Sequence, residues 1–245
     1  MKWIWWSVLW LRQILFYVYM VVITVVMASL TVICYFLRLP LRVRLFMSYS
    51  WSNLARLGCF IFLWQRLRVL NRKNVLRAEP CVYIVKHQSS WETMILHGFL
   101  YHICFVLKQE LLRIPFLGWG LKAVDSIPID RSQNLKSFKK VIAAGKDRLE
   151  LGLSIVIFPE GTRVAAGQYP KFHKTAMSLA KSTGAKVVPV AHNSGLCWPR
   201  KFGLIKPGSI TLSFGEMVSP KEMTIDELNS HCYQWINTEV KRLGG

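Results

Sequence analysis

The sequence predicts an α/β fold: a mixed, largely parallel sheet flanked by helices, with a membrane-embedded helical segment at the N-terminus. Two observations predict this class. After Pro80, short runs rich in β-branched residues alternate with helical runs, which is the pattern of strands joined by helices. Before them, residues 14–37 contain no charged side chain, and at about 1.5 Å per residue this run is long enough to cross a hydrocarbon core of roughly 30 Å.

The N-terminal segment carries two further marks of a membrane helix. Four indoles, which favour the lipid headgroup level, precede the apolar run at Trp3, Trp5, Trp6 and Trp10. Positive charge follows it at Arg38, Arg42 and Arg44. If the segment spans once, the positive-inside rule places the rest of the chain in the cytosol. A re-entrant, one-leaflet arrangement is the alternative, and residues 1–44 are assigned to a membrane anchor in either case.

Residues 45–245 are assigned to one catalytic domain that begins with a helix near 45–70. Three arginines interrupt the apolar residues of that helix, at Arg56, Arg66 and Arg68. An interfacial helix with these cations near lipid phosphates is one interpretation, and an ordinary core helix is the other.

The α/β pattern begins beyond this helix. Strands are expected at 81–86, 102–108, 125–129, 154–158, 186–191 and 209–214. Helices are expected near 90–100, 133–151, 171–183 and 225–242. Thr224 and Asp226 are candidate caps for the last of these helices.

Composition narrows the class of partner. The chain is 52% hydrophobic and carries a formal net charge of +19, a combination that suits an anionic membrane surface better than free solution. Nucleic acid is the other natural partner for such charge, but the chain has no zinc-finger spacing, RNA-binding motif or basic coiled-coil region. We therefore expect membrane lipids and no nucleic acid as partners.

Cysteine and histidine spacing argues against metals and disulfides. The six cysteines are scattered among apolar neighbours without a C-x-x-C pair, which favours reduced, buried thiols and a cytosolic catalytic part. The histidines other than His87 show no metal-binding spacing, so no metal is expected. Walker and dinucleotide-binding glycine motifs are absent, so neither nucleotide hydrolysis nor a dinucleotide cofactor is supported.

The first motif with chemical content reads His-Gln-Ser-Ser-Trp-Glu at 87–92. His87 directly follows the strand expected at 81–86, and Ser89 or Ser90 can cap the next helix. Because the chain turns back within five residues, Glu92 can accept a hydrogen bond from one imidazole nitrogen and leave the other free to take a proton. A simple surface pair is the alternative.

The second motif reads Phe-Pro-Glu-Gly-Thr-Arg at 158–163. Gly161 permits a tight backbone turn, and the proline before it stiffens the approach. The turn would deliver Glu160 and Arg163 into a cleft at the carboxyl end of the strand expected at 154–158, where α/β sheets bind their ligands.

Arg131 follows another expected strand and can converge on the same cleft. A guanidinium binds phosphate oxygens with two hydrogen bonds, so two arginines at such points indicate a phosphomonoester. For Arg131, an ion pair with Asp130 or a solvated loop position is the alternative.

Together these motifs resemble the glycerolipid acyltransferase family, membrane enzymes that include the bacterial 1-acyl-sn-glycerol-3-phosphate (lysophosphatidic acid) acyltransferases. In the order of the family's motifs, the matching residues are His87 to Glu92, Ile129-Asp130-Arg131, 158–163 and Val187-Val188-Pro189-Val190. Lys108-Gln109-Glu110-Leu111, followed by Ile114-Pro115 and Gly118, is similar to the stretch between the first two motifs. The resemblance covers roughly residues 80–215. Two departures are Glu92, where most members carry Asp, and Thr175, where they often carry Gly.

The resemblance implies transfer of a fatty acyl group from acyl-CoA or acyl-carrier protein to the sn-2 hydroxyl of lysophosphatidic acid, which forms phosphatidic acid. It implies His87 as general base oriented by Glu92, without an acyl-enzyme and without a cofactor beyond the co-substrate. Substrate-binding residues are expected to be Lys108, Arg131, Glu160, Gly161, Thr162 and Arg163, with Lys108 or backbone N–H groups as candidate oxyanion donors.

The implied location is the inner cell membrane, with the catalytic domain on the cytoplasmic side. Two other functions stay open at this point. One is acyl transfer to another lysophospholipid or a lyso-aminolipid, and the other is a non-catalytic scaffold at the membrane surface.

Overall fold

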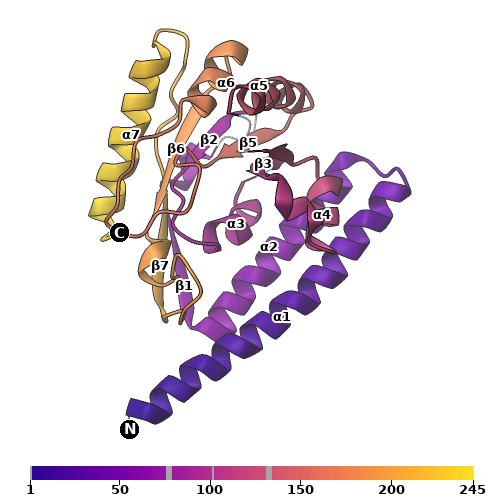
Figure 1. Cartoon of the computed structure of the whole chain (residues 1–245), viewed down its shortest axis with the longest axis vertical. Helices are drawn as coiled ribbons and strands as arrows, with labels where there is room; N and C mark the ends of the chain where they lie inside the picture. Colours follow the sequence, from indigo (N-terminus) through magenta and orange to yellow (C-terminus); the bar gives the residue numbers. More distant parts are fainter. Residues whose placement is uncertain (1, 76–78, 101, 131–133) are drawn as a thin grey trace.

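A seven-stranded sheet with helices on both faces is the centre of the molecule (Figure 1). The computed structural model describes residues 2–75, 79–100, 102–130 and 134–245. The strands are β1 (Gln65–Leu70), β2 (Val82–Val85), β3 (Ile103–Lys108), β4 (Ile127–Ile129), β5 (Ser154–Ile157), β6 (Val187–His192) and β7 (Gly208–Phe214). The helices are α1 (Lys2–Phe36), α2 (Leu41–Leu63), α3 (Trp91–Ile95), α4 (Leu117–Ala123), α5 (Asn134–Glu150), α6 (Thr175–Thr183) and α7 (Ile225–Arg242). Short 3₁₀ turns are η1 (Arg72–Asn74), η2 (Leu96–Gly98), η3 (Gln109–Arg113) and η4 (Ser194–Leu196).

The strand order is β1-β7-β6-β2-β5-β3-β4. The last five of these run parallel to one another, whereas β7 pairs antiparallel with β6 and parallel with β1. All residues of the central strands β2 and β5 are buried, as expected where a parallel sheet is covered on both faces. The predicted fold class, a mixed and largely parallel sheet flanked by helices, is confirmed.

Two apolar layers hold the helices to the sheet. On one face, Ile84 and Ile155 pack with residues of α5, α6 and α7, such as Leu179 and Leu228. On the other face, Tyr83 and its neighbours pack with residues that follow α3 and with α4. Helix α7 begins at the predicted cap, because the Thr224 hydroxyl accepts a hydrogen bond from the N–H of Glu227 while the Glu227 carboxylate accepts from the N–H of Thr224.

Helices α1 and α2 form an antiparallel hairpin beside the sheet domain (Figure 1). Successive contacts along it join Arg12 to the carbonyl of Phe62, Tyr19 to the carbonyl of Leu54, and Trp51 to the hydroxyl of Thr24. Within the described residues, α1 is the one helix that is long and apolar enough to cross a membrane.

The hairpin also contacts the rest of the chain at two points along α1. The side chain of Gln13 hydrogen-bonds the backbone of Gly203 and Ile205 in the loop between η4 and β7. Fifteen residues further along α1, Ala28 packs against Gly120 of α4. Since the helix rises about 1.5 Å per residue, these attachments lie roughly 22 Å apart along α1.

The helix expected near 45–70 differs from the structure. It begins at Leu41, inside the segment assigned to the anchor, and ends at Leu63, and residues 65–70 form strand β1 instead. Trp64 adopts a left-handed backbone conformation that ends the helix. Alternate residues of 65–70 face the core and solvent, a pattern that the preceding apolar helix obscured in the sequence.

We expect Gly58→Val to destabilise the protein by about 1–3 kcal/mol through overpacking of the hairpin. A Cβ atom at Gly58 would lie 2.5 Å from Cε1 of Tyr19. Thermal unfolding in detergent measures the effect, with Leu57→Val at an adjacent exposed position as the control. Since valine alone favours helix more than glycine does, equal or higher stability of Gly58→Val would contradict the tight crossing.

Candidate active site

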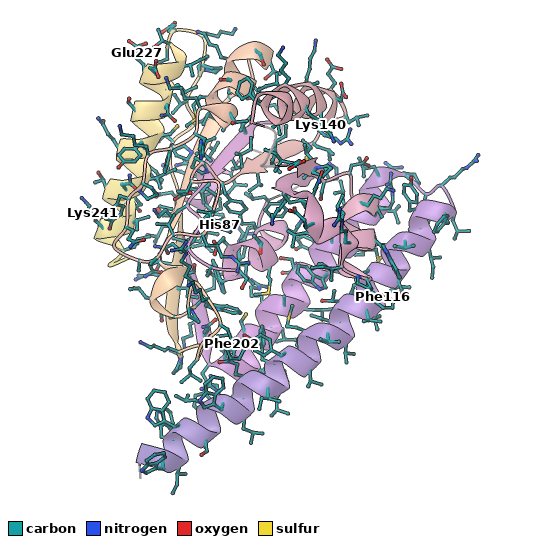
Figure 2. All side chains as sticks on the ribbon, viewed as in Figure 1. His87, Phe116, Lys140, Phe202, Glu227 and Lys241 are labelled. Carbon is teal, nitrogen blue, oxygen red and sulfur yellow. The ribbon has the colours of Figure 1, made fainter. Side chains whose placement is uncertain are left out.

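The sequence motifs lie at the carboxyl ends of neighbouring parallel strands. His87 follows β2, residues 158–163 follow β5, Lys108 ends β3, and Ser194 follows β6. Because parallel strands end at the same edge of a sheet, these residues meet although they are far apart in sequence. His87 lies near the centre of the molecule, on the side of the sheet that faces the α1–α2 hairpin (Figure 2).

His87 and Glu92 form the predicted pair. The Nδ1 atom of His87 lies 2.8 Å from Oε1 of Glu92. A carboxylate can only accept, so Nδ1 carries the proton and Nε2 is left as the basic nitrogen. The longer side chain of glutamate therefore reaches the imidazole from the first turn of α3.

Glu92 is fully buried, and several donors hold its carboxylate. Oε1 also accepts from the backbone N–H groups of Gln88 and Ser89, and Oε2 accepts from the hydroxyls of Ser89 and Ser194. Burial would raise the pKa of Glu92, but nearby His192, together with His87 and Ser89, outweighs it and lowers the pKa to about 2. The group that orients His87 is thus a carboxylate at neutral pH.

His192 and Ser194 are site residues that sequence reasoning missed. His192 is buried, its Nε2 atom donates to the carbonyl oxygen of Lys86, and the same atom lies 3.9 Å from Oε2 of Glu92. Burial lowers the pKa of His192, which is a second imidazole behind the carboxylate. Both residues follow the Val-Val-Pro-Val motif of β6, and that position at a strand end was the one available signal.

The turn after β5 supports the ring of His87 from one face. The Phe158 ring stacks on the imidazole with centroids 4.1 Å apart and planes at 21°. Gly161 has φ of 69°, a left-handed conformation that favours glycine, and a Cβ there would lie 3.2 Å from the His173 ring. The N–H of Val164 donates to the carbonyl oxygen of His87 at 2.7 Å and holds the turn against this residue.

A cavity of about 410 Å³ opens in front of His87. Lys108 and Arg163 line it together with His87, and its other walls come from the hairpin, α4 and β3. These walls are mostly apolar and include Met20, Met27, Met47, Leu117, Leu121 and Val124. His97 also lines the cavity, where burial lowers its pKa to about 4 and keeps it neutral. The site can therefore accept a molecule with an anionic end near the base and a long apolar part.

The expected substrate-binding residues fall into three groups. Lys108 and Arg163 share the cavity with His87, and both side chains have substantial solvent exposure. Gly161 and Thr162 form the turn between Arg163 and the buried Glu160. Arg131 lies outside the described residues.

Glu160 is not brought to the cavity with Arg163. Its side chain is 0% exposed, and its Oε1 atom lies 3.0 Å from the Nζ atom of Lys86. The side chain of Lys86 is also 0% exposed. Lys86 is a further residue that sequence reasoning did not single out. Its place at the end of a buried apolar run, one residue before His87, was the available signal.

No group of three potential metal ligands is found among the described residues, and all six cysteines are free thiols. The site combines an oriented imidazole with two cationic side chains and an apolar cavity. These groups can activate a hydroxyl group of an amphipathic molecule.

Comparison with known proteins defines the class. Residues 66–193 match the family described as Acyltransferase. The chain belongs to this family of enzymes, as the order of its motifs predicted.

Individual relatives make the likeness more specific. The chain is 36% identical over 209 residues to a 1-acyl-sn-glycerol-3-phosphate acyltransferase from Pseudomonas aeruginosa, which covers 84% of this chain and 81% of that protein. It is 26% identical over 197 residues to the human 1-acyl-sn-glycerol-3-phosphate acyltransferase beta, which covers 76% and 71% of the two chains. The crystal structure of the 1-acyl-sn-glycerophosphate (LPA) acyltransferase PlsC from Thermotoga maritima has the same fold, with a TM-score of 0.82, 24% identity and coverage of 96% and 95%.

Proposed function

We propose that this protein transfers a fatty acyl group from a thioester donor, acyl-CoA or acyl-carrier protein, to the sn-2 hydroxyl of lysophosphatidic acid and forms phosphatidic acid. The observation that carries the proposal is the His87–Glu92 pair at a cavity that is also lined by Lys108 and Arg163. The names of the curated relatives from bacteria and humans support this choice of acceptor.

In the proposed reaction, Nε2 of His87 takes the proton of the acceptor hydroxyl as its oxygen attacks the thioester carbonyl. The new C–O ester bond forms, the C–S bond breaks, and the proton passes from the imidazolium to the departing thiolate. Glu92 remains ionised and stabilises the imidazolium. No acyl-enzyme is needed, because the acceptor supplies the oxygen and the thiolate is a good leaving group.

The acceptor phosphate is proposed to bind the cations at the cavity. Arg163 offers a planar guanidinium on the turn after β5, and Lys108 offers an ammonium at the end of β3. Arg131 is proposed as a third phosphate contact, with Gly161 and Thr162 shaping the turn. The apolar walls between the hairpin and α4 are proposed to hold an acyl chain.

The protein is proposed to lie in the cytoplasmic leaflet of the inner membrane rather than to cross it. Two attachments of α1 to the catalytic domain, at Gln13 and Ala28, support this arrangement. If α1 crossed the bilayer, one of these attachments would draw polar backbone of the domain deep into lipid. The outward face of α1 is an apolar stripe that suits the acyl region of one leaflet: Leu11, Ile14, Val18, Val21, Val22, Val26 and Ile33.

We expect His87→Ala to lower kcat by at least about 100-fold, because general-base catalysis typically contributes ~10²–10⁴-fold. Binding of lysophosphatidic acid, measured by calorimetry in detergent, is expected to persist. His231→Ala, an exposed histidine on α7, is the matched control. Turnover by His87→Ala at the wild-type rate would refute the assignment of the base.

We expect Arg163→Ala to raise the KM for lysophosphatidic acid about tenfold or more, the equivalent of about 1.4 kcal/mol of lost phosphate binding. The KM for an uncharged monoacylglycerol acceptor should stay the same. Arg72→Ala, an exposed arginine outside the cavity, controls for net charge. A fall in kcat with both KM values unchanged would remove Arg163 from the phosphate site.

The membrane arrangement predicts that both ends of α1 are labelled from the same side. Single cysteines at the exposed positions Ser7 and Arg38, in a Cys34→Ala background, are treated with a membrane-impermeant maleimide in oriented vesicles. A cysteine at exposed Lys221 marks the side of the catalytic domain. Labelling of Ser7→Cys and Arg38→Cys from opposite sides would show a spanning helix and contradict the proposal.

A further inference from the structure

Lys86 and Glu160 form an ion pair in the interior, directly behind the site. Both side chains are 0% exposed, with 3.0 Å between Nζ and Oε1. Removing charges from water costs several kcal/mol each, so a buried pair persists only where the geometry returns most of that cost. Lys86 directly follows β2, one residue before His87, and Glu160 lies in the Phe-Pro-Glu-Gly-Thr-Arg turn after the neighbouring strand β5.

Lys86 joins several segments at this point. Its ammonium donates to the carbonyl oxygen of Gln168 at 3.0 Å and lies 5.3 Å from the centre of the Tyr169 ring. Its own carbonyl accepts from Nε2 of His192. The side chain and backbone of Lys86 therefore connect the end of β2 to the turn after β5, the loop that follows it, and β6.

The Lys86 ammonium has other partners besides Glu160, whereas the Glu160 carboxylate is paired with Lys86 alone among the described residues. The ammonium of Lys86 lies 3.0 Å from Oε1, and no other side-chain donor among the described residues pairs with either carboxylate oxygen. Burial raises the pKa of Glu160, and Lys86 opposes that rise. A carboxylate enclosed in this way cannot reach a molecule in the cavity. Arg163, which belongs to the same motif, does line the cavity.

We infer that Glu160 is a positioning residue that acts through Lys86, holding the turn with Phe158 and Arg163 against the end of β2, and that it does not contact the acceptor. This inference rests on the proposed function. The turn carries the ring that stacks on His87 and the N–H of Val164 that binds the His87 carbonyl, so a shift of the turn moves the base. Lys86 and Glu160 thus influence the chemical step rather than acceptor affinity.

The test is a double-substitution cycle with Lys86→Met, Glu160→Gln and the combined variant. Each single change leaves one buried polar group without its partner and should lower kcat at least about tenfold, with the KM for the acceptor unchanged. The combined variant removes both charges and keeps the shapes, so it should recover most of the lost kcat. The exposed pair Lys186–Glu79 provides the matched control, and Lys186→Met and Glu79→Gln should leave both constants unchanged.

The pH profile separates positioning from a general loss of folded enzyme. In Glu160→Gln the unpaired ammonium disfavours a protonated imidazole nearby, so the acidic limb of the kcat profile should move to lower pH, by about half a unit or more. In Lys86→Met the acidic limb should keep its wild-type position, because the buried Glu160 carboxyl takes up a proton. In the combined variant the limb should again lie at the wild-type position. The ionisable groups around His87 are otherwise the same in every variant: Glu92, His97, Lys108, Arg163 and His192.

Two results would overturn the inference. One is an acceptor KM that rises several-fold in Glu160→Gln and equally in the combined variant, which would mean that Glu160 binds the acceptor. The other is additive effects of the two substitutions, with no recovery in the combined variant. If Glu160→Gln does not fold, the acceptor KM of the combined variant decides alone, since a several-fold rise overturns the inference and a wild-type value supports it.

Failure of the proposed function would look different. In that case the wild-type enzyme would not acylate lysophosphatidic acid, whatever the variants do. The cycle is then measured as melting temperatures in detergent and as kcat with whichever acceptor the wild-type enzyme uses. Additive melting temperatures would overturn the Lys86–Glu160 coupling independently of the acceptor.

Discussion

The site depends on one buried carboxylate. Glu92 has no contact with water, and its two oxygens accept from His87, from two backbone N–H groups and from two hydroxyls. Those donors belong to the loop after β2 and to the turn after β6, while Glu92 itself lies in α3, so satisfying the charge brings three segments together. The same carboxylate selects the tautomer of His87. The hydrogen bonds that hold these segments together therefore also orient His87.

Much of the fold could be predicted from the sequence, because its signals are local. The strands around the site and helix α7 were expected nearly at their observed bounds, since runs of β-branched residues and a capping threonine are visible within a few positions. Strand β1 was not, because its residues follow an apolar helix without a glycine or proline to separate them. Residues 65–70 form a strand because they pair with β7, which lies more than a hundred residues away, and not because of their local sequence preference.

The same distinction between local sequence signals and long-range contacts applies to the residues of the candidate site. His87, Glu92 and Arg163 could be predicted as neighbours at the site because each belongs to a short sequence motif. Ser194 and His192 reach the carboxylate only through the packing of β6 against β2, and no spacing in the sequence relates them to Glu92. The burial of Glu160 could not be predicted either, since it depends on Lys86 at the end of a neighbouring strand.

The cavity has walls from two sources, and this has a consequence for how the protein can be altered. Met20 and Met27 belong to the first helix, while Leu117 and Leu121 belong to the folded domain. Trimming the hairpin to obtain a water-soluble fragment would open the chamber itself and lay bare the apolar sides of α3 and α4. A different pair of helices grafted onto the sheet would therefore not restore the cavity walls that Met20 and Met27 form.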